Sequence, residues 1–160
     1  MAANSRASHW RNAIVTAVLC IALSSCDRGA GEQIAVANKF SNAVVINNEP
    51  LIDSMIATVR LKEHFDNQFT RAELIRWIGS FYDKSTKRFK TKSSADVDDN
   101  FAEELGGGML RRGEIEETGK VRVRAPIKGE HDAYFWMVKQ EGRPWGVAMV
   151  TKGEMKVLFK

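Results

Sequence analysis

Cysteine is nearly absent from this sequence of 160 residues. It occurs only at positions 20 and 26, and no cysteine follows Cys26. The rest of the chain therefore cannot contain a disulfide framework, a cysteine-based metal site or a cysteine nucleophile. Residues 27–160 must fold and act without thiol chemistry.

Apolar runs of membrane-spanning length are also missing near the N-terminus. The run Ala13–Leu23 is uncharged over 11 residues, whereas a transmembrane helix needs about 20. Residues 1–12 before it are polar, with two arginines and no acidic residue. A basic polar segment followed by a short apolar run is typical of a secretory signal peptide. We therefore predict that residues 1–25 are a signal peptide that is removed.

The apolar run leads into the residues Leu23, Ser24, Ser25 and Cys26. One hydrophobic residue, two small residues and a cysteine, in this order, resemble the lipobox of bacterial lipoproteins. The resemblance implies cleavage before Cys26, a diacylglyceryl group on its thiol and a third acyl chain, such as palmitate, on its new amino group. Each buried methylene group contributes about 0.8 kcal/mol, so even two long chains hold a protein stably on a membrane.

The residue after this cysteine is Asp27, which resembles the signal that keeps enteric lipoproteins at the inner membrane. The resemblance implies an inner-membrane anchor, with the following domain facing the periplasm or the cell exterior. Residues 26–32 are small, polar and rich in glycine, which predicts a short lipidated tether. A single domain is then expected over residues 33–160.

A strong excess of one charge is missing from the predicted mature chain. Of the 24 basic residues, Arg6 and Arg11 precede Cys26, which leaves 22 against 20 acidic residues. Nucleic-acid-binding domains carry a larger basic excess, so we expect no nucleic-acid partner. The basic segment Lys84–Lys92 could bind phospholipid headgroups in a lipid-anchored protein. A solvated loop is the alternative, and the acidic residues that follow favour it.

The predicted domain begins with two stretches in which apolar residues recur at helical spacing. The first ends at Asn47 and Asn48, and Pro50, which is tolerated in the first turn of a helix, opens the second. Their predicted buried residues are, in chain order, Ile34, Ala37, Phe40, Ala43 and Val44, then Leu51, Ile52, Met55, Ile56 and Val59.

A third helix is predicted from Thr70 and Glu73, which have the spacing of a capping box, with Phe69 and Leu74 placed for a hydrophobic staple. Its predicted apolar face consists of Leu74, Ile75, Ile78, Phe81 and Tyr82, with Trp77 at the edge. A short fourth helix is predicted with caps at Ser93 and Asp96, apolar residues Val97, Phe101 and Leu105, and an end at Gly106, Gly107 and Gly108.

From Lys120 onward the apolar period changes to two, which is typical of strands. Turn-forming segments separate four apolar runs, over residues 121–125, 134–138, 145–150 and 155–159. N-terminal helices followed by a C-terminal antiparallel meander of four strands predict an α+β domain, in which the helices pack on one sheet face.

The segments AVANKFSNAVV and YFWMVKQEGRPWGVAMV, with a helical stretch between them, resemble small cone-shaped α+β proteins of the nuclear-transport-factor-2-like and cystatin-like kind. The resemblance spans most of residues 33–160. It implies a curved sheet around a pocket, which members use for ligands, for catalysis or for pairing subunits. The fold alone does not select among these roles.

The predicted hairpin is rich in aromatic residues. Tyr134, Phe135, Trp136 and Trp145 place rings on both of its faces, which is more than one buried face requires. Tyr134, Trp136 and Trp145 are therefore candidates for an interaction face or a pocket lining. Core packing against helices is the alternative, and it is favoured because aromatic residues are common in strands.

Motifs for catalysis or metal binding are missing. His64 and His131 are the only histidines after residue 26, neither has the spacing of a zinc site, and no GxSxG or phosphate-loop motif occurs. We predict no catalytic residue, no metal and no cofactor. The favoured hypothesis is a membrane-anchored periplasmic module that binds an envelope protein or itself. The alternatives are a small-ligand carrier and, last, an enzyme in which Asp83 and His131 converge.

Overall fold

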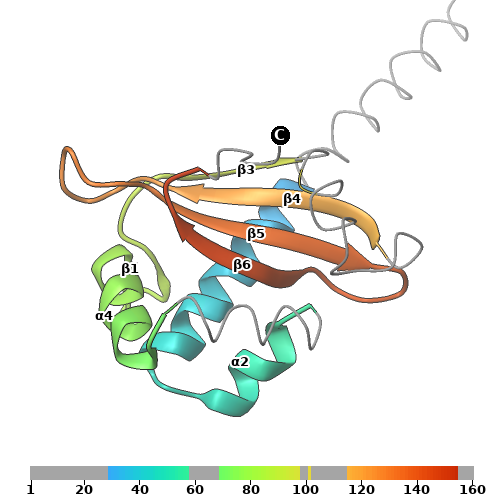
Figure 1. Ribbon diagram of the computed structural model, residues 1–160, viewed down its shortest axis with the longest axis horizontal. Coiled ribbons are helices and arrows are strands. Elements are labelled where there is room, and N and C mark those ends of the chain that lie inside the picture. Colours follow the sequence, from blue (N-terminus) through green and yellow to red (C-terminus); the bar gives the residue numbers. More distant parts are fainter. Residues whose placement is uncertain (1–28, 58–68, 98–100, 102–114, 155–160) are drawn as a thin grey trace, which may run out of the picture.

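The computed structural model describes residues 29–57, 69–97, 101 and 115–154 (Figure 1). Within them, three helices precede a four-stranded antiparallel sheet, which confirms the predicted α+β class. The predicted signal peptide, Cys26 and His64 lie outside the described residues, as do the glycines at 106–108 and the predicted strand over 155–159. None of the described helices is long and apolar enough to cross a membrane.

The first helix covers residues 29–45 and is the blue element of Figure 1. Four of its five predicted stripe residues, Ala37, Phe40, Ala43 and Val44, are at most 1% exposed, whereas Ile34 is only partly buried. Asn47 follows with a left-handed φ of 56°, a common way for a helix to end. Residues 29–32, which the sequence assigns to the tether, already belong to this helix. Burial of the later turns stabilises a helix that glycine alone would disfavour.

Helix α2 (Glu49–Met55) has Pro50 in its first turn, as predicted, and the Asn48 side chain accepts a hydrogen bond from a backbone amide of that turn. The helix ends earlier than its apolar spacing predicts. Ile56 is extended and forms a parallel bridge with Val147 of strand β6 (Gly146–Lys152). Pairing with the sheet therefore overrides helical periodicity at this point.

Helix α4 (Arg71–Phe81) begins with the predicted capping box. Thr70 Oγ1 accepts a hydrogen bond from the Glu73 amide at 3.3 Å, and the Glu73 carboxylate accepts one from the Thr70 amide at 3.1 Å. The side-chain and backbone hydrogen bonds from Thr70 lower the pKa of Glu73. The predicted apolar face of this helix includes Tyr82, but the helix ends at Phe81 because the backbone of Tyr82 is extended.

A small hairpin follows α4 where the sequence predicts a loop. Strands β1 (Tyr82–Asp83) and β2 (Arg88–Phe89) pair antiparallel. The Asp83 carboxylate organises the turn by accepting hydrogen bonds from the Ser85 amide at 2.9 Å and the Thr86 hydroxyl at 3.0 Å. After the hairpin, Lys90 Nζ donates to two carbonyl oxygens at the end of α4.

The main sheet has the strand order β3-β4-β5-β6, with β3 (Ser93–Val97), β4 (Ile115–Val123) and β5 (Ala133–Gln140) preceding β6. The antiparallel order agrees with the prediction, but the first strand is one that the sequence assigns to a helix start. The predicted caps at Ser93 and Asp96 are wrong, because both residues lie in β3 and pair with β4. Backbone pairing along five residues replaces the expected cap.

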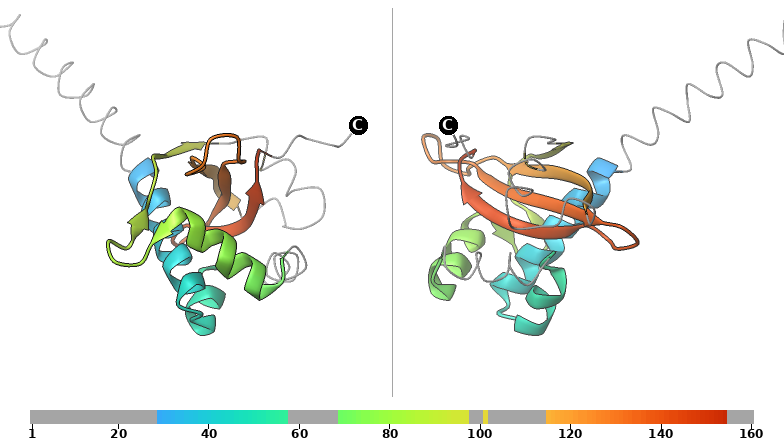
Figure 2. Two further views of the ribbon diagram at one scale, coloured as in Figure 1. Left: turned by 90° about the vertical axis from the view of Figure 1, so that its left-hand side faces the viewer. Right: turned by 45° about the vertical axis from the view of Figure 1, so that its right-hand side comes forward.

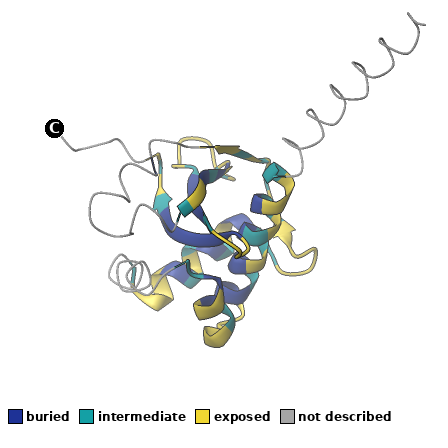
Figure 3. Cartoon of the chain, turned by 90° about the vertical axis from the view of Figure 1, so that its right-hand side faces the viewer, coloured by how far each residue is buried: buried dark blue, intermediate teal, exposed yellow. Residues whose placement is uncertain are grey.

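Helices cover one face of the sheet (Figure 2), and the main core lies between them. Burial is complete there, since Phe40, Ile78 and Phe135 are inaccessible to solvent. In Figure 3 the middle of the sheet is dark blue, while the outward sides of the helices are yellow. A second, smaller apolar cluster lies on the opposite face of the sheet and comprises Phe101, Tyr134, Trp136, Val138, Ala148 and Met149.

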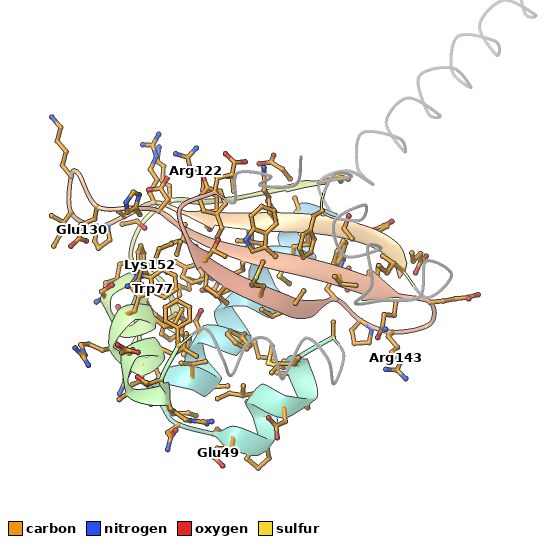
Figure 4. The ribbon with its side chains drawn as sticks, in the orientation of Figure 1. Glu49, Trp77, Arg122, Glu130, Arg143 and Lys152 are labelled. Carbon is orange, nitrogen blue, oxygen red and sulfur yellow. The ribbon has the colours of Figure 1, made fainter. Side chains whose placement is uncertain are left out.

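An aromatic contact ties α4 to the end of β6. Phe69 stacks on Trp77 with ring centroids 5.4 Å apart, and Lys152 Nζ lies 5.6 Å from the Trp77 centroid (Figure 4). The predicted staple residue Phe69 is thus part of a cation–π group. Such a contact contributes about 0.5–1 kcal/mol at an exposed site.

Gly119 allows the first helix to approach β4, and we expect Gly119→Ala to lower the free energy of unfolding by about 1–3 kcal/mol. A Cβ at this position would lie 2.6 Å from Gln33 Oε1 and 2.9 Å from the Asp96 carbonyl oxygen. Chemical denaturation measures the effect. The matched control is Gly79→Ala in α4, where a Cβ meets nothing within 4 Å and a gain of about 0.5–1 kcal/mol is expected. Equal stability of both variants would contradict the close approach.

Candidate functional site

The aromatic residues predicted as an interaction face do not form one. Tyr134, Trp136 and Trp145 are 7%, 3% and 4% exposed. They also lie on opposite sides of the sheet, because Trp145 belongs to the main core and the other two to the second cluster. The alternative, core packing, therefore describes these rings. Alternation along strands separates neighbours onto two faces, and both faces are covered at these positions.

The second cluster is bordered by charged residues that are already paired. Trp136 Nε1 donates a hydrogen bond to Thr151 Oγ1 at 2.9 Å. Arg122 binds Asp132 at 2.6 Å, and Lys120 binds Glu154. A hydrogen bond from the Ala125 amide, followed by the one from Arg122, lowers the pKa of Asp132. These ion pairs join two cations of β4 to acidic residues that stand just before β5 and just after β6.

The enzyme hypothesis requires Asp83 and His131 to converge, and the structure places them on different connections. Asp83 lies in the β1–β2 hairpin, where its carboxylate is engaged by Ser85 and Thr86. These hydrogen bonds lower its pKa, with the Ser85 side chain as the largest cause. His131 is exposed in the β4–β5 connection, next to Gly153. No described interaction joins the two side chains.

A groove of about 650 Å³ opens between the N-terminal helix, residues 29–45, and the β1–β2 hairpin with the chain that follows it. Figure 2 (left) shows this helix and hairpin side by side. We call this space the basic groove. Its lining residues are Gly31, Ile34, Ala35, Asn38, Lys39 and Asn42 from the helix, and Tyr82, Lys87, Arg88, Phe89, Thr91 and Ser93 from the hairpin side.

Three cations line the basic groove. Lys39, Lys87 and Arg88 are exposed and form no ion pair in the part of the chain that the structure describes. None of the described lining residues is Asp or Glu. Asp83 faces Arg88 in the hairpin register, but its carboxylate is turned to the hydroxyl and amide groups of its own turn. The groove is therefore a site of positive charge that suits an anion.

The floor of the groove is aromatic and neutral. Phe89 is partly buried, with its ring 6.2 Å from that of Tyr82 and 5.5 Å from that of Phe135 in the core. The phenol of Tyr82 is neutral, and burial raises its pKa further. An anion in the groove would thus meet cations at the rim and apolar rings below.

Asn38 holds the hairpin against the helix. Its Nδ2 donates to the Ile34 carbonyl oxygen at 3.0 Å, and its Oδ1 accepts a hydrogen bond from the Phe89 amide at 3.0 Å. The two bonded partners come from opposite walls of the groove. Asn38 therefore sets the spacing between Lys39 on the helix and Lys87 and Arg88 on the hairpin.

We expect Asn38→Ala to lower the free energy of unfolding by about 1–3 kcal/mol, because the partly buried Phe89 amide loses its acceptor. Hydrogen exchange followed by mass spectrometry should show faster exchange in the segment that carries this amide. Asn42→Ala is the matched control, since Asn42 lines the same groove one turn later without a described side-chain hydrogen bond. Unchanged exchange in the Asn38 variant would contradict this role.

Only one wall of this site carries a signal in the sequence. The basic segment Lys84–Lys92 supplies that wall, although the sequence favours a solvated loop for it. Lys39 and Asn38 were missed, because each stands on the polar side of a helix where such residues are ordinary. The feature of the sequence that indicates this site is the density of basic residues on both sides of Phe89.

Among the described residues, no group of three His, Cys, Asp or Glu side chains could hold a metal ion. Comparisons with protein-family models, with curated proteins and with solved structures found no match for this chain.

Proposed function

We propose that this chain is a bacterial lipoprotein of the cell envelope, anchored through Cys26, whose domain is a binding module for an anionic ligand. The observation that carries the binding role is the basic groove, in which Lys39, Lys87 and Arg88 have no counter-ion among the residues that the structure describes. Unpaired cations that converge on one concave surface are suited to a charged ligand.

The anchor is supported by the sequence Leu23, Ser24, Ser25, Cys26, which stands just before the first described helix. Acylation there holds the domain at a membrane without a spanning segment. The acyl chains supply the membrane affinity, so the domain itself is free to use its surface for recognition. The basic groove takes this role in place of Tyr134, Trp136 and Trp145, which are buried.

A carrier of a small anionic molecule is the second candidate. The groove volume of about 650 Å³ lies within the range of roughly 300–1,000 Å³ that is typical of ligand pockets. The ligand would bind in the basic groove and not in the cone-shaped pocket that the sequence resemblance implies. The side chains of Phe40, Ile78 and Phe135 fill the space between helices and sheet.

Native mass spectrometry of the full-length protein, expressed in bacteria and extracted in mild detergent, tests the anchor. We expect a chain that begins at Cys26 and carries three acyl chains, and we expect a Cys26→Ser variant without them. Cys20→Ser is the matched control and should be lipidated normally. An uncleaved or unlipidated wild-type protein would refute the lipoprotein assignment. A small anion that remains bound to the domain would favour the carrier.

A further inference from the structure

We infer that the basic groove binds the phosphate-bearing headgroups of anionic phospholipids in the membrane that holds the acyl chains of Cys26. The groove would then be a second membrane contact, which orients the domain so that the helix over residues 29–45 lies along the surface. This inference rests on the proposed anchor and names the ligand of the proposed binding site.

The position of the groove in the chain supports a membrane ligand. Only Asp27 and Arg28 separate Cys26 from residue 29, and the three steps from residue 26 to residue 29 span at most about 11 Å in a fully extended chain. The helix that starts there supplies one wall of the groove, from Gly31 to Asn42. That wall is about 17 Å long at the helical rise per residue. An anchor on Cys26 therefore keeps the groove close to lipid headgroups.

The groove chemistry fits a phospholipid headgroup better than a bare ion. The guanidinium of Arg88 can bind two phosphate oxygens at once, and the ammonium groups of Lys39 and Lys87 add point charges on both walls. Ile34 and Phe89 supply apolar surface below these cations. A headgroup joined to glycerol and acyl chains has both parts, an anionic phosphate and apolar atoms beside it.

The conformation of Lys87 gives the test a well-folded variant. Its φ of 54° is left-handed, a conformation that costs energy for residues with a Cβ and that glycine adopts freely. Lys87→Gly therefore removes a groove cation and relieves the turn at the same time. Combined with Lys39→Gln and Arg88→Gln at exposed positions, it forms the groove variant. The control variant removes three exposed cations elsewhere, with Arg76→Gln, Lys128→Gln and Arg143→Gln.

The experiment measures binding to vesicles with the chain over residues 26–160, in which Cys26→Ser removes the acylation site. One set of vesicles is phosphatidylcholine alone, and the other also contains phosphatidylglycerol. Thermal unfolding of each variant checks that it is folded. Each basic residue near an anionic surface contributes roughly a fivefold gain in binding, so the groove variant should bind phosphatidylglycerol vesicles about 100-fold more weakly. The control variant should bind nearly as well as the protein with an unchanged groove. Vesicles of phosphatidylcholine alone should bind none of these proteins.

Three outcomes would overturn the inference. Equal losses in the groove and control variants would mean that net charge alone drives binding. Absence of binding to phosphatidylglycerol would exclude the headgroup. Binding of inorganic phosphate to the domain, without any binding to phosphatidylglycerol vesicles, would identify a free phosphate as the ligand. Because the chain in this assay has no acyl group, its result is independent of the lipidation test on Cys26.

Discussion

Phe135→Ala is expected to lower the free energy of unfolding by about 3–5 kcal/mol, because it removes a large, fully buried aromatic side chain. Phe135 is fully buried at the centre of the sheet, where its ring lies 6.3 Å from Phe40 of the first helix and 5.5 Å from Phe89 of the hairpin. Removing it leaves a cavity where helix, sheet and hairpin meet. Urea denaturation followed by tryptophan fluorescence measures the loss.

The same substitution should also disturb the basic groove, since Phe89 forms part of its floor. Phe135→Leu keeps most of the volume and is expected to cost less than the alanine variant. Ile127→Ala is the control on the surface, because Ile127 is 61% exposed and such a change is usually within about 0.5 kcal/mol. A Phe135→Ala protein as stable as the control would contradict the described core.

Trp136→Ala is expected to lower the free energy of unfolding by about 3–5 kcal/mol as well. Its indole ring is 5.0 Å from Phe101 and 6.2 Å from Tyr134, on the sheet face away from the helices. Trp136→Phe, which keeps an aromatic ring and loses the hydrogen bond to Thr151, should cost about 1 kcal/mol. Thermal unfolding of both variants gives the comparison.

This pair distinguishes a core residue from an interaction residue. An exposed interaction residue can be removed with little effect on folding, whereas a core residue cannot. A Trp136→Ala protein with wild-type stability would mean that this ring is not part of the core and would restore Trp136 as a candidate interaction residue. Strong destabilisation of the Trp136→Ala protein would confirm that Trp136 is a core residue. The basic groove would then remain the candidate binding site.

Local sequence patterns predicted the helices well, because the interactions that start and end a helix join residues a few positions apart. The capping box of Thr70 and Glu73 spans three residues, Pro50 acts in its own turn, and Asn47 ends the first helix. The apolar stripe of each helix likewise indicates which side of that helix is buried. Alternation in residues 121–125 and 134–138 identified β4 and β5 in the same way.

Tertiary pairing decided the elements that the sequence missed. The segment Ser93–Val97 has little apolar alternation, and it becomes a strand because β4 supplies backbone partners along its length. Ile56 leaves helical geometry for the same reason, through its bridge to Val147. Such partners lie far away in the chain, so no local pattern reports them.

Patterns in the sequence were enough to predict the α+β class, the three helices, three of the four sheet strands and the absence of thiol chemistry after Cys26. The burial of Tyr134, Trp136 and Trp145 emerges only in the folded domain, because coverage of a sheet face depends on segments distant in the chain. It also assembled the basic groove, in which Asn38 reaches Phe89 across 51 positions of sequence. The physical reason is that charge and burial depend on neighbours in space, whereas helix caps and strand alternation depend on neighbours in sequence.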